Sequence, residues 1–242
     1  PTENTTALTT FTATDADGDA LIYSISGGAD KDLFQIDSAT GVLTFISAPD
    51  YENPLDADTD NVYDVQVSAT DPSGASTSVG YVVTVNDVNE TPSALALSAS
   101  TFAENAAGVT VGTISATDPD TGETFTYAIS GTDKDSFELS GTTLKLIDTV
   151  SADFEADSSY SITLTATDSA DNTVSKDYTI TVTDVNEEAT LVLGNTTISE
   201  NSIGGSVGTI TITDPDIGSD NTLSISGTDK DSFELSGTTL KL

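Results

Sequence analysis

The chain has 242 residues, enough for two domains or slightly more, and a formal net charge of −34, from 40 acidic and 6 basic residues with no histidine. Phosphates would repel such a chain, so we expect no nucleic-acid partner, and an anionic membrane surface is disfavoured for the same reason. Cysteine is absent, so a secreted chain of this composition must be held together by its core, by bound metal or by both. No apolar run approaches the roughly 18–20 residues of a membrane span, and no membrane insertion is expected in this part of the protein.

Apolar and polar residues alternate with period two, in short runs rich in Thr, Val, Ile and Tyr that are interrupted by Gly, Asp and Asn. In the middle of the chain the predicted strands are Leu95–Thr101, Val109–Ala116, Phe125–Ser130, Ser136–Leu139, Thr143–Ile147, Tyr160–Thr167 and Val174–Thr183. In one of them, alternation places Tyr160, Ile162, Leu164 and Ala166 on the core face. Short strands without helical periodicity predict an all-β fold, built of tandem seven-stranded Greek-key (immunoglobulin-like) β-sandwiches.

Internal sequence repeats indicate that the chain consists of tandem domains. Residues 129–146 recur without change at 225–242. Diverged acidic signatures recur as well, in the order Glu-Asn, Thr-Asp-x-Asp, Asp-aromatic-Glu, Ala-Thr-Asp and Asp-Val-Asn-Glu. The period of roughly 97–103 residues predicts repeats at 1–90 and 91–188, and an incomplete third repeat at 189–242 that we expect to belong to a longer array.

Two acidic connectors each follow a predicted strand. They are Asp87-Val88-Asn89-Glu90 and Asp184-Val185-Asn186-Glu187, and neither has a Lys or Arg beside it. In a sandwich with an odd number of strands the chain leaves at the end opposite its entry. The first connector should therefore meet the Asp118/Asp120 and Asp168 loops of the next repeat, with Glu3 and Asp50/Glu52 in turns on its own side.

Crowded carboxylates without basic neighbours repel one another unless a divalent cation binds them. Calcium (Ca2+) takes 6–8 oxygen ligands and suits a set of carboxylates, amides and backbone carbonyls. Zinc would require His or Cys, which the sequence lacks, and magnesium demands tighter octahedral geometry. The connectors are therefore predicted to be calcium sites.

The signatures, in this order and at this period, resemble the cadherin repeat, in the form seen in large bacterial surface adhesins. The resemblance covers the whole chain. It implies cadherin-like sandwiches joined end to end, with three calcium ions at each junction. Glu90 and Glu187 depart from the family pattern, which usually has Asp at this position. Their longer side chains are expected to make the calcium site less tightly held.

The resemblance also implies which residues bind calcium. At the first junction they would be Glu3, Asp50, Glu52, Asp87, Asn89 and Glu90, the backbone carbonyls of Val88 and Thr91, and Asp118, Asp120 and Asp168. At the second junction they would be Glu104, Asp153, Glu155, Asp184, Val185, Asn186, Glu187, Asp214 and Asp216. Asp15, Asp17 and Asp71 have no upstream repeat in this sequence to complete their site, so they are expected to bind weakly.

Other acidic groups have simpler explanations. The stretch Asp15 to Asp19 resembles the start of a helical calcium loop, but the twelfth position is Ser26 rather than Glu, which excludes that motif. The stretch Asp56 to Asp60 lies in a longer loop that either holds an extra ion or is simply solvated. Carboxylate pairs could serve a glycosidase, but without His, Cys or Trp no catalysis is expected.

Three functions are consistent with these patterns. The favoured one is a calcium-stiffened extender in a bacterial cell-surface adhesin or extracellular filament. The alternatives are a homophilic or receptor-binding adhesion module, and a calcium-dependent carbohydrate-binding module. Expected partners are calcium, other copies of the chain arranged end to end or laterally in a fibre, and a surface receptor or glycan of unknown identity. The expected location is extracellular, either at the cell surface or secreted.

Overall fold

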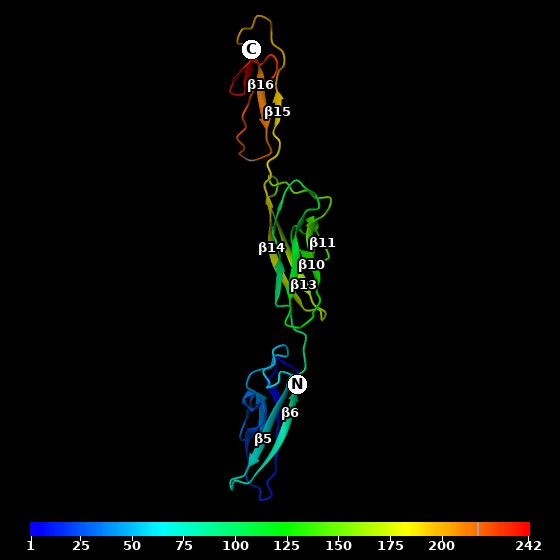
Figure 1. The fold of residues 1–242 in the computed structure, drawn as a ribbon, viewed down its shortest axis with the longest axis vertical. Coiled ribbons are helices and arrows are strands. Elements are labelled where there is room, and N and C mark those ends of the chain that lie inside the picture. The colour runs from blue at the N-terminus through cyan, green and yellow to red at the C-terminus, as the bar shows by residue number, and fades with distance from the viewer. Residues whose placement is uncertain (217) are drawn as a thin grey trace. The chain divides into compact units, whose positions relative to one another are not determined.

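The computed structural model of the chain describes residues 1–216 and 218–242. They form short strands and single-turn 3₁₀ helices (Figure 1), which confirms the all-β class predicted from the alternation. In the described part of the chain, no helix has both the length and the apolar character needed to cross a membrane.

The first sandwich contains the strands β1 to β6. Its elements are β1 (Ala7–Thr10), β2 (Ile22–Gly27), η1 (Lys31–Leu33), β3 (Phe34–Ile36), β4 (Val42–Phe45), β5 (Val62–Thr70) and β6 (Ser76–Thr84). One sheet has the order β1-β4-β3 and the other β2-β5-β6. The antiparallel pair of β5 and β6 is clear in Figure 1 and runs without a register shift from Val62 opposite Thr84 to Thr70 opposite Ser76. At the chain start, Thr2 forms a parallel bridge with Asn86 just beyond β6.

The core of this sandwich is formed by both sheets. Its buried residues are Phe34, Leu43, Phe45, Tyr63, Val65, Val67, Val83 and Val85. The rings of Phe34 and Phe45 stack with their centroids 4.8 Å apart, and the Phe45 and Tyr63 rings meet edge to face at 5.2 Å. Aromatic pairs in this range add to the stabilisation from buried area, so the core can hold the loops at the end of β6 in place.

The second sandwich contains β7 (Ala94–Leu97), β8 (Thr101–Ala103), β9 (Thr110–Thr117), β10 (Thr126–Ser130), η2 (Lys134–Ser136), β11 (Phe137–Ser140), β12 (Thr143–Leu146), β13 (Ser159–Thr167) and β14 (Thr173–Thr183). Its sheets have the orders β7-β9-β12-β11 and β10-β13-β14-β8. Ile162, Leu164 and Ala166 are buried, whereas Ser161 is exposed. The predicted alternation along β13 is thus confirmed.

The predicted single strand Leu95–Thr101 was wrong, because the structure divides it between the two sheets. β7 pairs with β9 in one sheet, and β8 pairs in parallel with β14 in the other. The change of sheet occurs near Ala99, whose backbone N and O atoms would lie only 2.9 Å from a Cβ atom at Gly112. Glycine at position 112 of β9 therefore leaves the space in which the chain passes from β7 to β8.

The described residues after β14 form one sheet of order β15-β16-β18-β17. Its elements are β15 (Thr190–Leu193), β16 (Ser206–Thr213), η3 (Lys230–Ser232), β17 (Glu234–Ser236) and β18 (Thr239–Lys241). This order repeats that of the β7-β9-β12-β11 sheet, whereas residues 222–226, which correspond to β10, form no strand.

The identical segments 129–146 and 225–242 differ in burial. Leu144 is fully buried, whereas Leu240, the same position of the duplicated sequence, is only partly buried. In the second sandwich the β10-β13-β14-β8 sheet provides the opposite apolar face, and the described residues of 189–242 contain no second sheet. Burial here depends on the tertiary partner and not on the local sequence.

Candidate metal centres

A buried glutamate organises each acidic cluster. Glu3 is only 2% exposed, and its two carboxylate oxygens accept the backbone N–H groups of Tyr51 and Val88 at 2.8 and 2.9 Å. The same side chain therefore holds both the Asp50–Glu52 turn and the connector after β6. Burial of a carboxylate is tolerated here because backbone donors satisfy both oxygens.

The second cluster repeats this arrangement in a diverged sequence. Glu104 is 4% exposed and accepts the N–H groups of Phe154 at 2.5 Å and Val185 at 2.8 Å. The spacing from the glutamate to each of its two donors is nearly the same as in the first cluster. Two independent copies therefore place the Asp-aromatic-Glu turn and the Asp-Val-Asn-Glu connector around one carboxylate.

Carboxylate oxygens lie close together in overlapping groups. In the first cluster, oxygens of Glu3, Glu52 and Glu90 lie within 4.8 Å of one another, and so do oxygens of Glu52, Asp87 and Asp120. Glu52, Asp87 and Asp120 also line an open cavity together with Glu123.

The second cluster has groups of the same size. Glu104, Asp153 and Glu155 form one, and Glu155, Asp184 and Asp216 form the other. Glu52 and Glu155 are the shared members, at equivalent positions of the two repeats.

The loops that follow β9 and β13 complete the first cluster. One compact unit contains residues 1–94, 117–126 and 167–174, and thus every residue assigned to the first site. Asp120 accepts the Glu90 N–H at 2.7 Å, and Asp168 accepts the Asn89 amide at 2.8 Å. Asp118 accepts the Asp120 N–H at 3.1 Å, which sets the turn.

The loop after β16 has the same role in the second cluster, within the other compact unit. Asp216 accepts the Glu187 N–H at 2.9 Å, and Asp214 accepts the Asp216 N–H at 3.0 Å. The Asn186 amide donates to the backbone oxygen of Glu187 at 2.8 Å.

Some predicted residues lie outside these groups. Asp50 is exposed and accepts the Asn53 N–H at 3.0 Å, and among the described residues it joins no group of close carboxylates. Asp15 and Asp71 accept N–H groups of their own turns, from Asp17 at 2.8 Å and from Ser73 at 2.8 Å. Val88 and Val185 contact the sites through their N–H groups, which bind the buried glutamates, and Thr91 is exposed.

Burial and mutual repulsion raise the pKa values of acids in both clusters. Burial, together with the charges of Glu3, Glu90 and Asp87, raises the pKa of Glu52 to about 7 from its ordinary value of 4.5. Burial and the charge of Asp120 raise the pKa of Asp87, and burial and the charge of Asp216 raise that of Asp184. Excess negative charge is therefore concentrated at both connectors.

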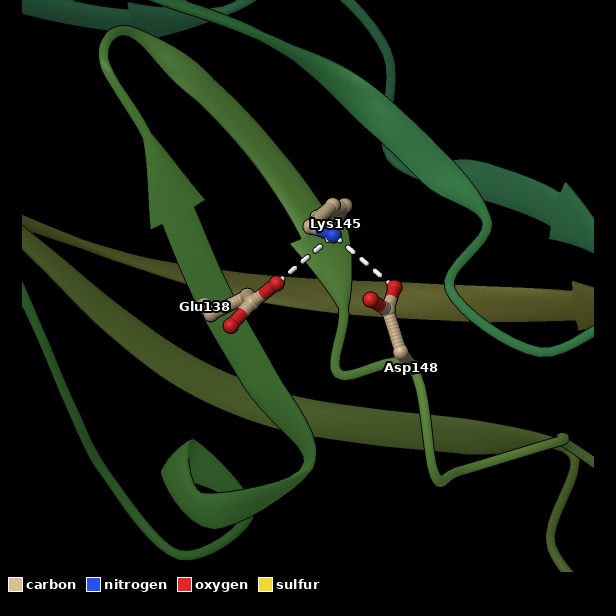
Figure 2. A network of polar contacts seen from close by, with 3 residues as sticks. All are labelled: Glu138, Lys145 and Asp148. Atoms are coloured by element: carbon tan, nitrogen blue, oxygen red, sulfur yellow. Dashed lines mark hydrogen bonds and ion pairs between the residues drawn. The ribbon is translucent and has the colours of Figure 1, made fainter.

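Lysines do not compensate this charge. The ion pairs among the described residues are Lys134–Asp135, Lys145–Glu138, Lys145–Asp148 and Lys230–Asp231. Figure 2 shows Lys145 between Glu138 and Asp148, with nitrogen–oxygen distances of 2.7 and 2.9 Å. Within the described residues, no lysine pairs with a carboxylate of either cluster.

Buried oxygens without a hydrogen-bond partner are concentrated in the clusters. Within the described residues, the buried side-chain atoms lacking a partner are Glu52 Oε2, Asn61 Oδ1, Glu90 Oε2, Asp118 Oδ2, Glu155 Oε1 and Glu187 Oε2. Apart from Asn61, which lines the same open cavity, all are carboxylate oxygens of predicted site residues. Unpaired buried anionic oxygens are costly in isolation, and a hard cation with oxygen ligands would satisfy them. The residues present fit calcium.

Sequence reasoning missed several amides that contact the site carboxylates. Asn4 and Asn105 donate to the connector glutamates, and Asn172 donates to Asp168 at 3.0 Å. The recurrence of Glu-Asn was the available signal for the first two. In the loop left open above, Asp56, Asp58 and Asp60 have oxygens within 4.8 Å of one another. Asp56 is buried and accepts the Asp60 and Asn61 N–H groups, so it also stabilises its loop.

Comparisons with known proteins agree with this architecture. The family model for the cadherin domain matches residues 2–86 and 98–183. Protocadherin Fat 4 of Homo sapiens is 37% identical over 153 residues, covering 60% of this chain and 3% of that protein. Protocadherin gamma-A2 of Homo sapiens is 31% identical over 234 residues, covering 88% of this chain and 24% of that protein. The chain thus spans about a quarter or less of these curated relatives.

Among solved structures, mouse cadherin-23 EC22-24 matches with a TM-score of 0.63 and 22% identity, covering 100% of this chain and 83% of that one. At this identity the match supports the fold alone. The family model, in contrast, matches more than half of the sequence and finds two tandem copies. The chain belongs to the cadherin family.

Proposed function

We propose that the chain is a calcium-stiffened structural segment of an extracellular or cell-surface adhesion protein. The observation that carries the proposal is the set of buried, unpartnered carboxylate oxygens in both clusters, at Glu52, Glu90, Asp118, Glu155 and Glu187. Glu52 and Glu155, and likewise Glu90 and Glu187, occupy equivalent positions in repeats whose surrounding sequences differ. A merely solvated acidic surface would leave such oxygens in contact with water.

In this proposal each cluster joins segments that are distant in the sequence. Glu3 and Glu104 hold a turn and a connector through backbone N–H groups, and the connector N–H groups of Glu90 and Glu187 bind Asp120 and Asp216. The cation supplies the positive charge that allows these carboxylates to stay ionised and close together. The residues that would bind it are those assigned above, with repeat boundaries at 90/91 and 188/189.

The finer assignment, to a bacterial surface adhesin or extracellular filament, is part of the proposal and rests on the sequence resemblance. The excess acidity supports an extracellular setting with abundant cations. Three ions at each of two junctions would add about +12, which leaves a chain of net charge −34 still strongly acidic and soluble. Adhesion between copies, with a receptor or with a glycan remains an alternative role of the same segment.

Small-angle X-ray scattering of the 242-residue chain, combined with calorimetry, tests the proposal. We expect calcium binding, and a well-defined maximum dimension at millimolar calcium that becomes a broad distribution in excess chelator. The double variant Glu3→Gln/Glu104→Gln should remain flexible at the same calcium concentration. The matched control, Asp32→Asn, removes an exposed charge outside the clusters and should behave like the unmodified chain. Identical profiles with and without calcium, and no heat of binding, would refute the proposal.

A further inference from the structure

A Glu-Asn pair occurs in each repeat, and its glutamate is the buried Glu3 or Glu104 in the first two. Asn4, Asn105 and Asn201 all have positive φ, at 59°, 67° and 62°. This left-handed region is uncommon for residues with a side chain, and Asn tolerates it better than most. The backbone alone could therefore explain the choice of asparagine.

The side-chain amides of the first two copies have an additional contact. The Asn4 amide donates to Glu90 Oε1 at 2.6 Å, and the Asn105 amide donates to Glu187 Oε1. In both glutamates the second oxygen, Oε2, is buried and has no partner. Glu90 lies in the close carboxylate group with Glu3 and Glu52. One oxygen of each connector glutamate is thus fixed, and the other is left available for a ligand.

Asn201 separates the backbone requirement from this contact. It adopts the same positive φ, but within the described residues its side chain makes no hydrogen bond to a carboxylate. The left-handed conformation therefore does not depend on the amide–carboxylate bond. The contact occurs in the two copies that have a connector glutamate.

We propose that Asn4 and Asn105 are positioning residues, which fix the side chains of Glu90 and Glu187 so that Oε2 of each is presented as a single calcium ligand. A glutamate has one more rotatable bond than an aspartate, and immobilising it costs conformational entropy on ion binding. A hydrogen bond from a neighbouring amide fixes the glutamate side chain before the ion binds. Residues that hydrogen-bond to metal ligands commonly have this role. This inference rests on the proposed calcium function.

The test replaces both asparagines by glycine, which accepts positive φ without strain and removes only the amide. We expect Asn4→Gly/Asn105→Gly to weaken the calcium affinity of part of the sites by about 10-fold, the low end of the usual range for such partners. Calorimetry with calcium chloride measures the affinity and the number of ions. The melting temperature in chelator should stay within a few degrees of that of the unmodified chain. Asn201→Gly is the matched control and should leave calcium affinity unchanged.

A second comparison separates positioning from a structural role. In a Glu90→Asp/Glu187→Asp background the shorter side chains should not reach the amides, so adding the two glycine substitutions should change calcium affinity by less than about twofold. An equal loss in both backgrounds would overturn the inference, because the asparagines would then act through the backbone. If the unmodified chain binds calcium and Asn4→Gly/Asn105→Gly binds equally well, the inference alone fails. If the unmodified chain binds no calcium, the proposed function fails and the inference with it.

Discussion

Replacing Glu52 by Gln should have opposite effects on the calcium-free and calcium-bound protein. Without calcium, Glu52 is a half-buried charge beside Glu3, Glu90 and Asp87, and its pKa is raised from 4.5 to about 7. Glutamine has nearly the same shape and no charge, so Glu52→Gln should stabilise the calcium-free first sandwich. It should weaken calcium binding, because Glu52 is shared by both carboxylate groups of its cluster.

The magnitude follows from the pKa. The difference between 4.5 and about 7 sets an upper limit of about 3 kcal/mol, at about 1.36 kcal/mol per pKa unit. Because the side chain is partly exposed and screened by solvent, we expect about 1–2 kcal/mol. For a domain of this size the melting temperature in chelator should therefore rise by about 5–10 °C.

The pH dependence has a definite sign. An acid with a raised pKa in the folded state takes up its proton first in that state, so the calcium-free protein should gain stability as the pH falls from about 7 to about 4.5. Glu52→Gln should remove much of this gain. Circular-dichroism melts in chelator at pH 8 and pH 5.5 measure both effects, and Glu155→Gln provides the same test in the second cluster. A lower melting temperature for Glu52→Gln in chelator, or an unchanged pH dependence, would refute the electrostatic reasoning.

Three further changes test the fold. Leu144→Ala removes a fully buried side chain and should lower the free energy of unfolding by about 2–5 kcal/mol. Leu240→Ala, in the identical segment, should lower it much less because that site is only partly buried. Chemical denaturation measures both losses, and equal losses would contradict the difference in burial. Gly112→Ala should cost about 1–3 kcal/mol in the same assay, because the new methyl group would lie 2.9 Å from the backbone of Ala99, and a neutral result would mean that the crossover is not tightly packed. Asp30→Ala removes a buried carboxylate that accepts the N–H groups of Ala57 and Asp64, each at 2.7 Å, and should cost about 1–3 kcal/mol with faster amide exchange at both. Unchanged exchange would mean that the carboxylate does not hold these two segments together.

The sandwich could be predicted from sequence because its signal is local. Alternation such as Ile162, Leu164 and Ala166 reports which face of a strand is buried, whatever the strand packs against. The change of sheet near Ala99 could not be predicted, since it depends on the space beside a glycine in another strand.

The candidate site, too, was predictable where the sequence signal is local and not where it depends on long-range contacts. The acidic residues recur at a fixed period, so their convergence on Glu3 and Glu104 could be inferred from the order of the motifs. The contact from Asn4 to Glu90 joins side chains 86 residues apart and depends on the direction in which a left-handed residue projects its amide. The recurring Glu-Asn motif was a signal for the asparagine, but its partner depends on the folded structure.

The duplicated segment has a consequence for how the chain folds. β12 and β18 have the same sequence, so β9 cannot distinguish them by side chains, and only the length of the intervening loop favours the nearer one. The loop from β9 to β12 is about a fifth as long as that to β18, which favours the nearer partner by about 1.4 kcal/mol, or about tenfold. From loop length alone, we expect roughly one first pairing in ten to involve the more distant copy when both copies are present. We therefore expect strand exchange between the repeats to be rarer when the nearer copy docks before the second is synthesised than when the whole chain refolds.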